Sequence, residues 1–580
     1  MRTSTFFISS LFTYALALPV PFTDLTLSRL STRASSTVSA TSSTVNNTTL
    51  ISNKYVVAHH MVGNTFPYTS QDWLNDIKLA HASGIDGFAL NMGSDDWQPA
   101  RVADAYAAAQ NSSLDFKMFL SLDMSILPCS TVNDASSLRA LVTTYLSHPN
   151  QLRYSRGSAT QLPLVSTFAG ESCTFGQGSV SDGWRTQFAQ HPDLQGKITF
   201  VPSFFVSPTQ MSQFQGIVDG TFNWNGGWPV ELTTDSTGSS SSTLSSTLKN
   251  LLGINTTTNA IGKFSNSDDT QTSTASTASG LQSLENALSS FIGSTDSDSQ
   301  FINVSSGSTS NNVYIAAVSP WFFTHFGKNS FNKNFLYIAD QHLYSKRWES
   351  LIPAQGPLVN DLNTTTTSTQ PSISDQVDIV EIISWNDYGE SHYVGPIEGA
   401  LPTGSEAWTD GMNHTAWLSL TSYYAAAFKN GSYPSVPLDE ERVVMWSRTH
   451  PAAANAVSDS VGSVPGSELV LDALWAVTVL SAPANVTLQV VPSSSNSSNS
   501  NSTASIAEET FTVSAGLTKL TIPIFVPDGM PSVSMRAVVQ RGDDSVMELD
   551  AASQGFEFVE TPQQFNFNAW VGCAGGGCIV

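Results

Sequence analysis

The sequence predicts an α/β fold, a (β/α)8 TIM barrel with insertions, followed by a C-terminal antiparallel β-sandwich domain. Three observations lead to this prediction. Between residues 54 and 432, short apolar runs alternate with segments of helical periodicity. Nearly every apolar run ends in polar or aromatic residues, and the ends of parallel barrel strands meet at one face. After residue 432 the pattern changes to short alternating strands separated by turn residues.

Eight apolar runs supply the expected barrel strands. In chain order they are Tyr55–His59, Gly87–Asn91, Lys117–Asp123, Leu164–Phe168, Ile198–Pro202, Gly220–Trp224, Val313–Val318 and Ile379–Ser384. Helices are expected over Ser70–Ser83, Pro99–Gln110, Ser136–Ser147, Ser181–Gln190, Asp340–Leu351 and Thr415–Lys429. The expected strands of the C-terminal domain, residues 433–580, are Val443–Trp446, Leu474–Leu480, Asn485–Val491, Glu509–Val513, Leu520–Ile524 and Val533–Val539.

Segments of a different composition precede the barrel region and interrupt it. Residues 1–17 have a charged start, an apolar core and an Ala-Leu-Ala cleavage site, typical of a secretory signal peptide. Residues 18–53 form a Ser/Thr-rich, disordered lead-in, and residues 233–312 form a low-complexity insertion expected to be mobile and glycosylated. Asn-x-Ser/Thr sequons, such as those at Asn47 and Asn413, fit a secreted glycoprotein.

Charge and cysteine content exclude several classes of partner. The net charge of −23 over 580 residues argues against binding of nucleic acid or of anionic membranes, which need basic patches. Four cysteines in a secreted chain favour two disulfides, most simply Cys129–Cys173 and Cys573–Cys578. Their spacing lacks the pattern of a zinc site, so we expect no metal and no cofactor. The chain is expected to be a monomer.

The stretch after the eighth expected strand has the strongest functional signal. It places the carboxylates Asp387 and Glu390 three positions apart, with Trp385, Tyr388 and His392 beside them. Two carboxyl groups among sugar-stacking rings suit hydrolysis of a glycosidic bond, which needs an acid and a base or nucleophile. The plainer alternative is a surface loop with two unrelated acids. Other residues at expected strand ends are candidates for sugar contacts: His59, Asn91, Asp123, Glu171, Asn223, Trp224, Trp321 and His325, with Asp95 as a third acid.

With these residues in view, the chain resembles the fungal glycoside hydrolases of family 71, the α-1,3-glucanases or mutanases. The resemblance rests on ordered motifs spanning 58–63, 84–95, 166–171, 318–327 and 385–396. It implies a secreted, cell-wall enzyme that cleaves internal bonds of α-1,3-glucan with inversion, using Asp387, Glu390 and Asp95. Two departures are the long 233–312 insertion and Glu171, where the family pattern leads us to expect an Asp.

Within this reading Glu390 is the expected general acid and Asp387 the expected base. Asp95 is the alternative base, because side chains three positions apart on one loop leave little room for a water between them. Asp123 is equally well explained as a helix N-cap, whereas His59 and His325 are expected to line the sugar subsite, with a purely structural role as the alternative. Two further functions stay open, a barrel glycosidase acting on another polysaccharide and an inert wall-glucan-binding protein. The C-terminal domain is expected to support the barrel rather than to bind carbohydrate.

Overall fold

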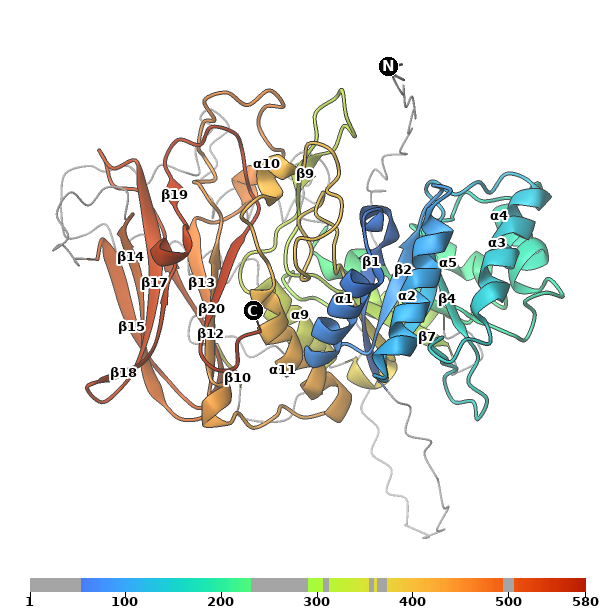
Figure 1. The fold of residues 1–580 in the computed structure, drawn as a ribbon, viewed down its shortest axis with the longest axis horizontal. Helices are drawn as coiled ribbons and strands as arrows, with labels where there is room; N and C mark the ends of the chain where they lie inside the picture. The colour runs from blue at the N-terminus through green and yellow to red at the C-terminus, as the bar shows by residue number, and fades with distance from the viewer. Residues whose placement is uncertain are drawn as a thin grey trace, which may run out of the picture.

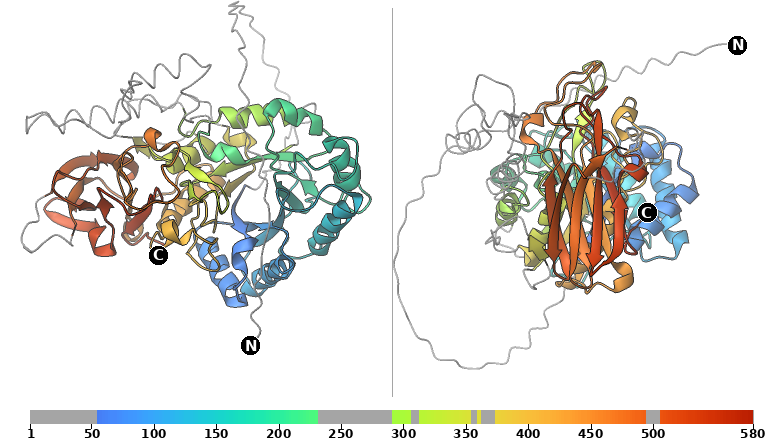
Figure 2. Two further views of the ribbon diagram at one scale, coloured as in Figure 1. Left: turned by 90° about the horizontal axis from the view of Figure 1, so that it is seen from above. Right: turned by 90° about the vertical axis from the view of Figure 1, so that its left-hand side faces the viewer.

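A computed structural model describes residues 54–230, 291–305, 312–353, 359–361, 373–493 and 505–579. The predicted signal peptide, the lead-in and most of the predicted insertion lie outside these residues. Figure 1 and Figure 2 show a barrel with surrounding helices, and beside it a region of antiparallel strands that contains most of the C-terminal part. Among the helices of the described residues, none has the length and apolar character needed to span a bilayer.

The barrel is an eight-stranded parallel sheet. Its strands, in spatial order, are β5 (Thr199–Phe200), β4 (Leu164–Phe168), β3 (Lys117–Asp123), β2 (Gly87–Met92), β1 (Tyr55–Met61), β11 (Ile379–Ile382), β7 (Val313–Val318) and β6 (Gly220–Asn223). The two edge strands approach each other, because the backbone N–H of Asp219 donates to Phe200 O at 2.8 Å and that of Phe222 to Pro202 O at 3.1 Å. The predicted parallel strands are thereby confirmed as a nearly closed barrel.

Helices cover the outside of this sheet, so its strands are buried on both faces and consist largely of apolar residues. The helices are α1 (Ser70–Ala82), α2 (Gln98–Ser112), α3 (Val132–Tyr145), α4 (Val180–Gly183), α5 (Pro208–Met211), α9 (Leu343–Leu351) and α11 (Ala416–Asn430), with a π-helical turn, Trp184–Ala189, after α4. Capping boxes formed by Thr69 with Asp72 and by Thr131 with Asp134 begin α1 and α3. Most predicted helices are therefore found within a few residues of their expected bounds.

One part of the predicted insertion is packed rather than loose. Residues 291–305 include α8 (Asp296–Ser305), whose Asp298 carboxylate is completely buried. Both of its oxygens lie 2.7 Å from guanidinium nitrogens of Arg347, and Tyr314 donates its hydroxyl to Asp298 at 2.7 Å. A buried carboxylate needs such partners. The Ser- and Asp-rich composition of this stretch predicts mobility because it hides the buried ion pair and the few core side chains, Phe301 and Ile302 among them, that hold it.

Two largely antiparallel sheets make up most of the C-terminal region. The first has the order β10 (Val359–Asp361), β16 (Gly516–Pro523), β13 (Ala473–Leu480), β12 (Arg442–Ser447) and β20 (Trp570–Ala574). Its edge strand β10 precedes the C-terminal region in the chain and pairs parallel with β16, whereas the other neighbours are antiparallel. The second has the order β15 (Ala507–Val513), β14 (Ala484–Pro492), β17 (Ser532–Arg541) and β18 (Asp544–Asp550), with β19 (Phe558–Val559) paired to β17. The six predicted strands are present, and β18, β19 and β20 had not been predicted.

The first of these sheets separates two apolar cores. Along β12, Val444 and Trp446 join the core of the barrel, while Val443 and Met445 join a second core shared with the other sheet. This alternation follows from the two-residue period of a strand. Because one face of the sheet packs on the barrel, the barrel core continues into the C-terminal region.

Candidate active site

Three side chains of the loop after β11 converge. His392 Nε2 lies 3.2 Å from Glu390 Oε2 and 3.6 Å from Asp387 Oδ2, and donor atoms of the three residues all lie within 4.8 Å of one another. The His392 side chain is completely buried, whereas those of Asp387 and Glu390 keep 16% and 20% exposure. The two acids can therefore reach a ligand, while the imidazole holds them from behind. The predicted pair is brought together as expected, and the predicted crowding is found as well.

Backbone contacts hold this loop in shape. Asp387 N donates to Ser384 Oγ at 2.8 Å, and Glu390 N donates to Asp387 Oδ1 at 3.2 Å. Tyr388 donates its hydroxyl to Pro396 O at 2.8 Å, and its side chain is buried. Trp385 is also buried and packs against Phe88 at a centroid distance of 5.1 Å. Tyr388 and Trp385 thus help to hold the loop in shape, and their contact with a sugar stays a prediction.

A hairpin that follows β7 contributes a cation to the site. Its strands are β8 (Phe323–His325) and β9 (Asn334–Leu336), and Lys333 immediately precedes β9. Lys333 Nζ lies 2.7 Å from Glu390 Oε1, and Phe323 N donates to Glu390 O at 3.0 Å. The hairpin therefore holds both the side chain and the backbone of Glu390.

The pKa values of the two carboxyl groups are shifted in opposite directions. Burial, the largest effect, raises the pKa of Asp387; His392 opposes the rise and the charge of Glu390 adds to it. Burial would also raise the pKa of Glu390, but Lys333 and His392 outweigh it and hold that pKa well below its usual value. Since the pair titrates as a unit, the first proton taken up belongs mainly to Asp387. Of the two groups, Asp387 therefore has the higher pKa and Glu390 is the more readily ionised.

A second carboxylate–imidazole pair lies inside the barrel. His59 lies toward the C-terminal end of β1. Its Nδ1 is 2.7 Å from Glu381 Oε1 on β11, and both side chains are 1% exposed. The remaining atoms, His59 Nε2 and Glu381 Oε2, are buried without a hydrogen-bond partner among the described residues. Burial raises the pKa of Glu381, against the effect of His59. The His59 ring also meets Trp224 edge-on at 4.8 Å.

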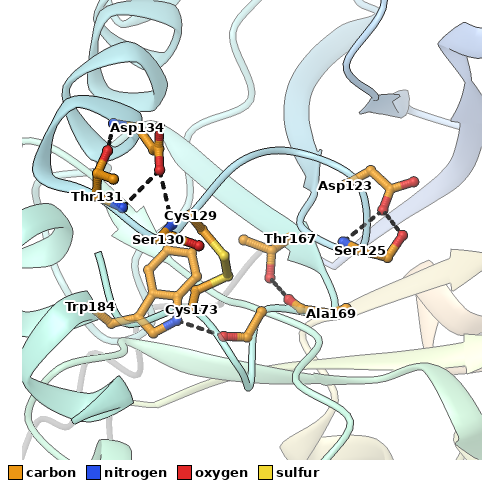
Figure 3. The surroundings of a disulfide bond; sticks show 11 residues. Asp123, Ser125, Cys129, Ser130, Thr131, Asp134, Thr167, Ala169, Cys173 and Trp184 are labelled. Carbon is orange, nitrogen blue, oxygen red and sulfur yellow. Dashed lines mark hydrogen bonds between the residues drawn. A yellow bond between two sulfur atoms is a disulfide. The ribbon is translucent and has the colours of Figure 1, made fainter. Parts of the chain in front are cut away.

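The loops after β3 and β4 bring further acids and are joined by the Cys129–Cys173 disulfide (Figure 3). Asp123 is buried and accepts hydrogen bonds from the backbone and hydroxyl of Ser125; burial raises its pKa, and the charges of His59 and Lys333 oppose that rise. It does not cap α3, a role taken by Thr131. Glu171 is half-buried and accepts a hydrogen bond from Phe205 N at 3.1 Å.

Asp95 belongs to a different loop from the pair. It is exposed on the loop after β2, and its carboxylate accepts a hydrogen bond from Gln98 Nε2 at 2.8 Å, at the start of α2. Among the described residues, no hydrogen bond or ion pair joins it to Asp387 or Glu390. Asn91 is buried on the same strand. Nearby, Phe66 is 63% exposed and meets Trp97 at 5.2 Å, which gives the loops after β1 and β2 an open aromatic surface.

Three other predicted sugar contacts are occupied by protein partners. Trp321 is 1% exposed and donates from Nε1 to Phe567 O at 2.8 Å. Both ring nitrogens of His325 are engaged, Nδ1 with Asn334 Oδ1 and Nε2 with Asp459 Oδ2, each at 2.8 Å. Asn223 donates from Nδ2 to a serine of α8 at 3.0 Å. These side chains are held by protein partners, and their contact with a sugar stays a prediction.

Sequence reasoning missed Lys333, Glu381 and the exposed ring of Phe66 with its neighbour Trp97. A signal existed for the first two. Glu381 is an acid inside the apolar run Ile379–Ile383, where a buried charge demands a partner, and Lys333 is one of only 24 Lys and Arg residues. His392, Asp387 and Glu390 also have the donor types of a cation site, but Lys333 already supplies a positive charge to Glu390.

Comparison with known proteins gives concordant matches. The model of the family described as "Glycosyl hydrolase family 71" matches residues 52–578. A glucan endo-1,3-alpha-glucosidase of Schizosaccharomyces pombe is 34% identical over 521 residues, 90% of this chain and 94% of the relative. A mutanase of Penicillium rubens is 28% identical over 527 residues, covering 90% and 89%. Among solved structures, a GH99 endo-alpha-mannosidase from Bacteroides thetaiotaomicron has a TM-score of 0.38 and 10% identity, covering 65% of this chain and 98% of that one.

Proposed function

The chain belongs to glycosyl hydrolase family 71 and is a glycoside hydrolase, and from that premise we propose that it cleaves internal α-1,3-glucosidic bonds of cell-wall glucan. The observation that carries this proposal is the Asp387–Glu390 pair at the barrel mouth. The two carboxyl groups lie beside one buried histidine, His392, and their pKa values are shifted in opposite directions. Relatives whose names specify endo-1,3-alpha-glucosidase and mutanase support the linkage. A polysaccharide substrate also suits the net charge of −23, since neutral sugars need no basic patch.

We propose acid and base roles that are the reverse of those expected from the sequence, supported by the directions in which the two pKa values are shifted. Asp387, whose pKa is raised by burial, is the better proton donor to the leaving glycosidic oxygen. Glu390, kept ionised by Lys333, takes a proton from the attacking water. The oxygen of that water bonds to the anomeric carbon while the glycosidic C–O bond breaks. Each turnover thus consumes one water and leaves a proton on Glu390, which must return to Asp387 through solvent or His392.

The stereochemical outcome depends on how the pair opens. We propose inversion, in line with the family resemblance. Inverting carboxyl groups stand roughly 6.5–9.5 Å apart, whereas nearest donor atoms of this pair lie within 4.8 Å in the free protein. For inversion we propose that the Glu390 side chain moves away from His392 when a glucan and a water enter, which makes room for the water between the two carboxyl groups. The short spacing favours one alternative, a retaining reaction in which Glu390 attacks the anomeric carbon itself.

Other residues are assigned supporting parts in the same proposal. His59, Asn91, Asp123, Glu171 and Trp224 contact sugars at the barrel mouth, and Phe66 and Trp97 provide an outlying stacking surface. Residues 54–432 act as the catalytic domain. Residues 433–580 form a β-sandwich, supported by the core that the two antiparallel sheets share, and the sandwich supports the barrel. We propose that the protein is secreted, glycosylated, located at the cell wall and monomeric.

A substrate panel tests the proposal. The purified protein is incubated with insoluble α-1,3-glucan, a β-1,3-glucan and dextran, and soluble products are separated by size. We expect oligosaccharides of several lengths from α-1,3-glucan alone, since an endo-acting enzyme cuts within chains. Products from another polymer instead would assign the site to that polymer, and binding of α-1,3-glucan without any products would assign the protein to the inert binding proteins.

A further inference from the structure

The β8–β9 hairpin contacts the Asp387–Glu390 pair on one side and the C-terminal region of the chain on the other. On the catalytic side it holds Glu390 twice, through Phe323 N to Glu390 O at 3.0 Å and through Lys333 Nζ to Glu390 Oε1 at 2.7 Å. The Lys333 side chain is 31% exposed and, like any lysine, has a flexible four-carbon stem. Its position therefore depends on the hairpin backbone that carries it.

On the other side, the hairpin is fastened to the C-terminal region. His325, the last residue of β8, places Nε2 2.8 Å from Asp459 Oδ2, and the side chains of this pair are 6% and 5% exposed. Asn334, the first residue of β9, donates from Nδ2 to Ser463 O at 3.0 Å. The two residues face each other in the hairpin register and are also joined, His325 Nδ1 to Asn334 Oδ1 at 2.8 Å.

Asp459 is held in place by its own surroundings. Its Oδ1 accepts hydrogen bonds from the backbone of Val461 and Gly462 at 2.8 and 2.9 Å, and its Oδ2 accepts one from Phe565 N at 2.9 Å. Because these donors are backbone groups on two separate segments, the carboxylate is oriented independently of His325. The two ring nitrogens of His325 lie 2.8 Å from Asn334 Oδ1 and Asp459 Oδ2, which fixes the ring between these two residues.

We propose that Asp459 and His325 form a positioning pair through which the C-terminal region sets the placement of Lys333 against Glu390. The inference rests on the proposed function and deepens it, since the C-terminal region becomes part of the active-site architecture. Neither residue contacts the substrate. Their effect is exerted through residue 334, which is bonded to His325 and directly follows Lys333.

Variants of Asp459 test the inference. Asp459→Ala is expected to lower kcat on soluble α-1,3-glucan oligosaccharides by roughly 10- to 100-fold, with KM within about threefold, since the catalytic groups shift while the sugar contacts stay. Asp459→Asn keeps the side-chain volume and is expected to have a smaller effect in the same direction. Amide hydrogen exchange is expected to quicken over residues 323–336 in both variants.

A control separates this effect from general loosening of the junction. Lys519 Nζ on β16 lies 2.6 Å from Glu349 Oε2 on α9, an ion pair between the same two parts of the chain but away from the hairpin. Lys519→Met is expected to lower the unfolding temperature as Asp459→Ala does. Its kcat is expected to stay within about twofold of the wild type, and exchange over 323–336 is expected to be unchanged.

A double variant asks whether Asp459 acts through Lys333. Lys333→Met removes the cation directly, so adding Asp459→Ala to it is expected to lower kcat by no more than about twofold further, because coupled residues are not additive. His325→Gln retains a donor that can reach Asp459 and is expected to recover part of the activity lost in His325→Ala. Recovery of this kind is not expected if His325 only fills space.

Three results would overturn the inference: unchanged exchange over 323–336 in Asp459→Ala and Asp459→Asn, fully additive losses in the double variant, or an equal loss of kcat in Lys519→Met. A wild type without activity on the glucan would instead overturn the proposed function. In that case the exchange measurement, which needs no substrate, still decides whether Asp459 fastens the hairpin.

Discussion

Lys333 and His392 create the difference in pKa between Asp387 and Glu390, two acids on the same loop. Both carboxyl groups are partly covered, so burial raises the proton affinity of each. Only Glu390 has a direct hydrogen bond from the ammonium group of Lys333, and it also lies closer to His392. A charge-assisted contact of this kind favours the ionised form. Thus the assignment of acid and base follows from neighbours, and not from the identity of Asp or Glu.

Replacing Lys333 by Met is expected to move the pH–rate profile toward higher pH. Lys333 lowers the pKa of Glu390 and, less directly, that of Asp387, so both values rise when it is lost. The acidic limb requires ionised Glu390 and the alkaline limb requires protonated Asp387; both limbs therefore shift upward. The other charged or titratable groups near the pair, His392 and Tyr337, remain in place. Initial rates across the pH range measure the shift, and an acidic limb that stays or moves lower would contradict this assignment.

At the level of residues, the sequence was informative only where partners are close in the chain. Asp387, Glu390 and His392 lie within one loop, so their spacing alone indicated a site. Lys333 and Glu390 are 57 positions apart, and His59 and Glu381 are 322 apart. Such pairs depend on the fold. The burial of Trp321 and Trp385 could not be predicted either, because a Trp at a strand end supplies a buried ring as readily as an exposed one.

Among the elements, the loops after β3 and β4 depend on a covalent link. The Cys129–Cys173 disulfide joins the loop that begins at Asp123 to the loop that carries Glu171 (Figure 3). Trp184 Nε1 donates to Gly170 O at 2.9 Å beneath it, which ties the second loop to the helical segment after α4. The two loops therefore present their acids as a single wall of the barrel mouth.

Loss of this disulfide is expected to destabilise the protein more than loss of the other one. In the chain-entropy model, a crosslink across 44 positions contributes about 4 kcal/mol to the free energy of unfolding, and one across 5 positions about 2 kcal/mol. We therefore expect a larger decrease in unfolding temperature for Cys129→Ser/Cys173→Ser than for Cys573→Ser/Cys578→Ser. Equal decreases in thermal scans, or a reversed order, would contradict the expectation.

Predictability of the elements followed their burial. The barrel strands were recognisable because helices cover their outer face and side chains fill the interior of the barrel. Both faces of each strand are therefore buried, which gives continuous apolar runs in the sequence. The edge strand β18, by contrast, has mostly exposed side chains, and β8 and β9 are three residues each. Short or edge strands carry too little pattern to be recognised. The hairpin that holds Glu390 belongs to this class.

On the scale of the whole molecule, barrel and C-terminal region form one structure. The sheet containing β12 and β13 contributes alternate side chains to two cores, and Trp446 packs against Trp417 of α11 at 4.7 Å. The sequence predicted two domains and a supporting role for the second. It could not indicate that the support reaches the hairpin at the catalytic pair, because that depends on contacts between residues more than a hundred positions apart, such as His325 and Asp459.

The most direct test of the account replaces each member of the pair. Wild type, Asp387→Asn, Glu390→Gln and, for comparison, Asp95→Asn are incubated with α-1,3-glucan oligosaccharides, and the first products are followed by proton NMR. We predict β-anomeric products from the wild type, a loss of roughly 10²- to 10⁴-fold in each of the two pair variants, and a loss below about tenfold in Asp95→Asn. α-Anomeric products would replace inversion by retention at the same pair. Near-normal rates in Asp387→Asn or Glu390→Gln would contradict the central claim that these two carboxyl groups carry the reaction.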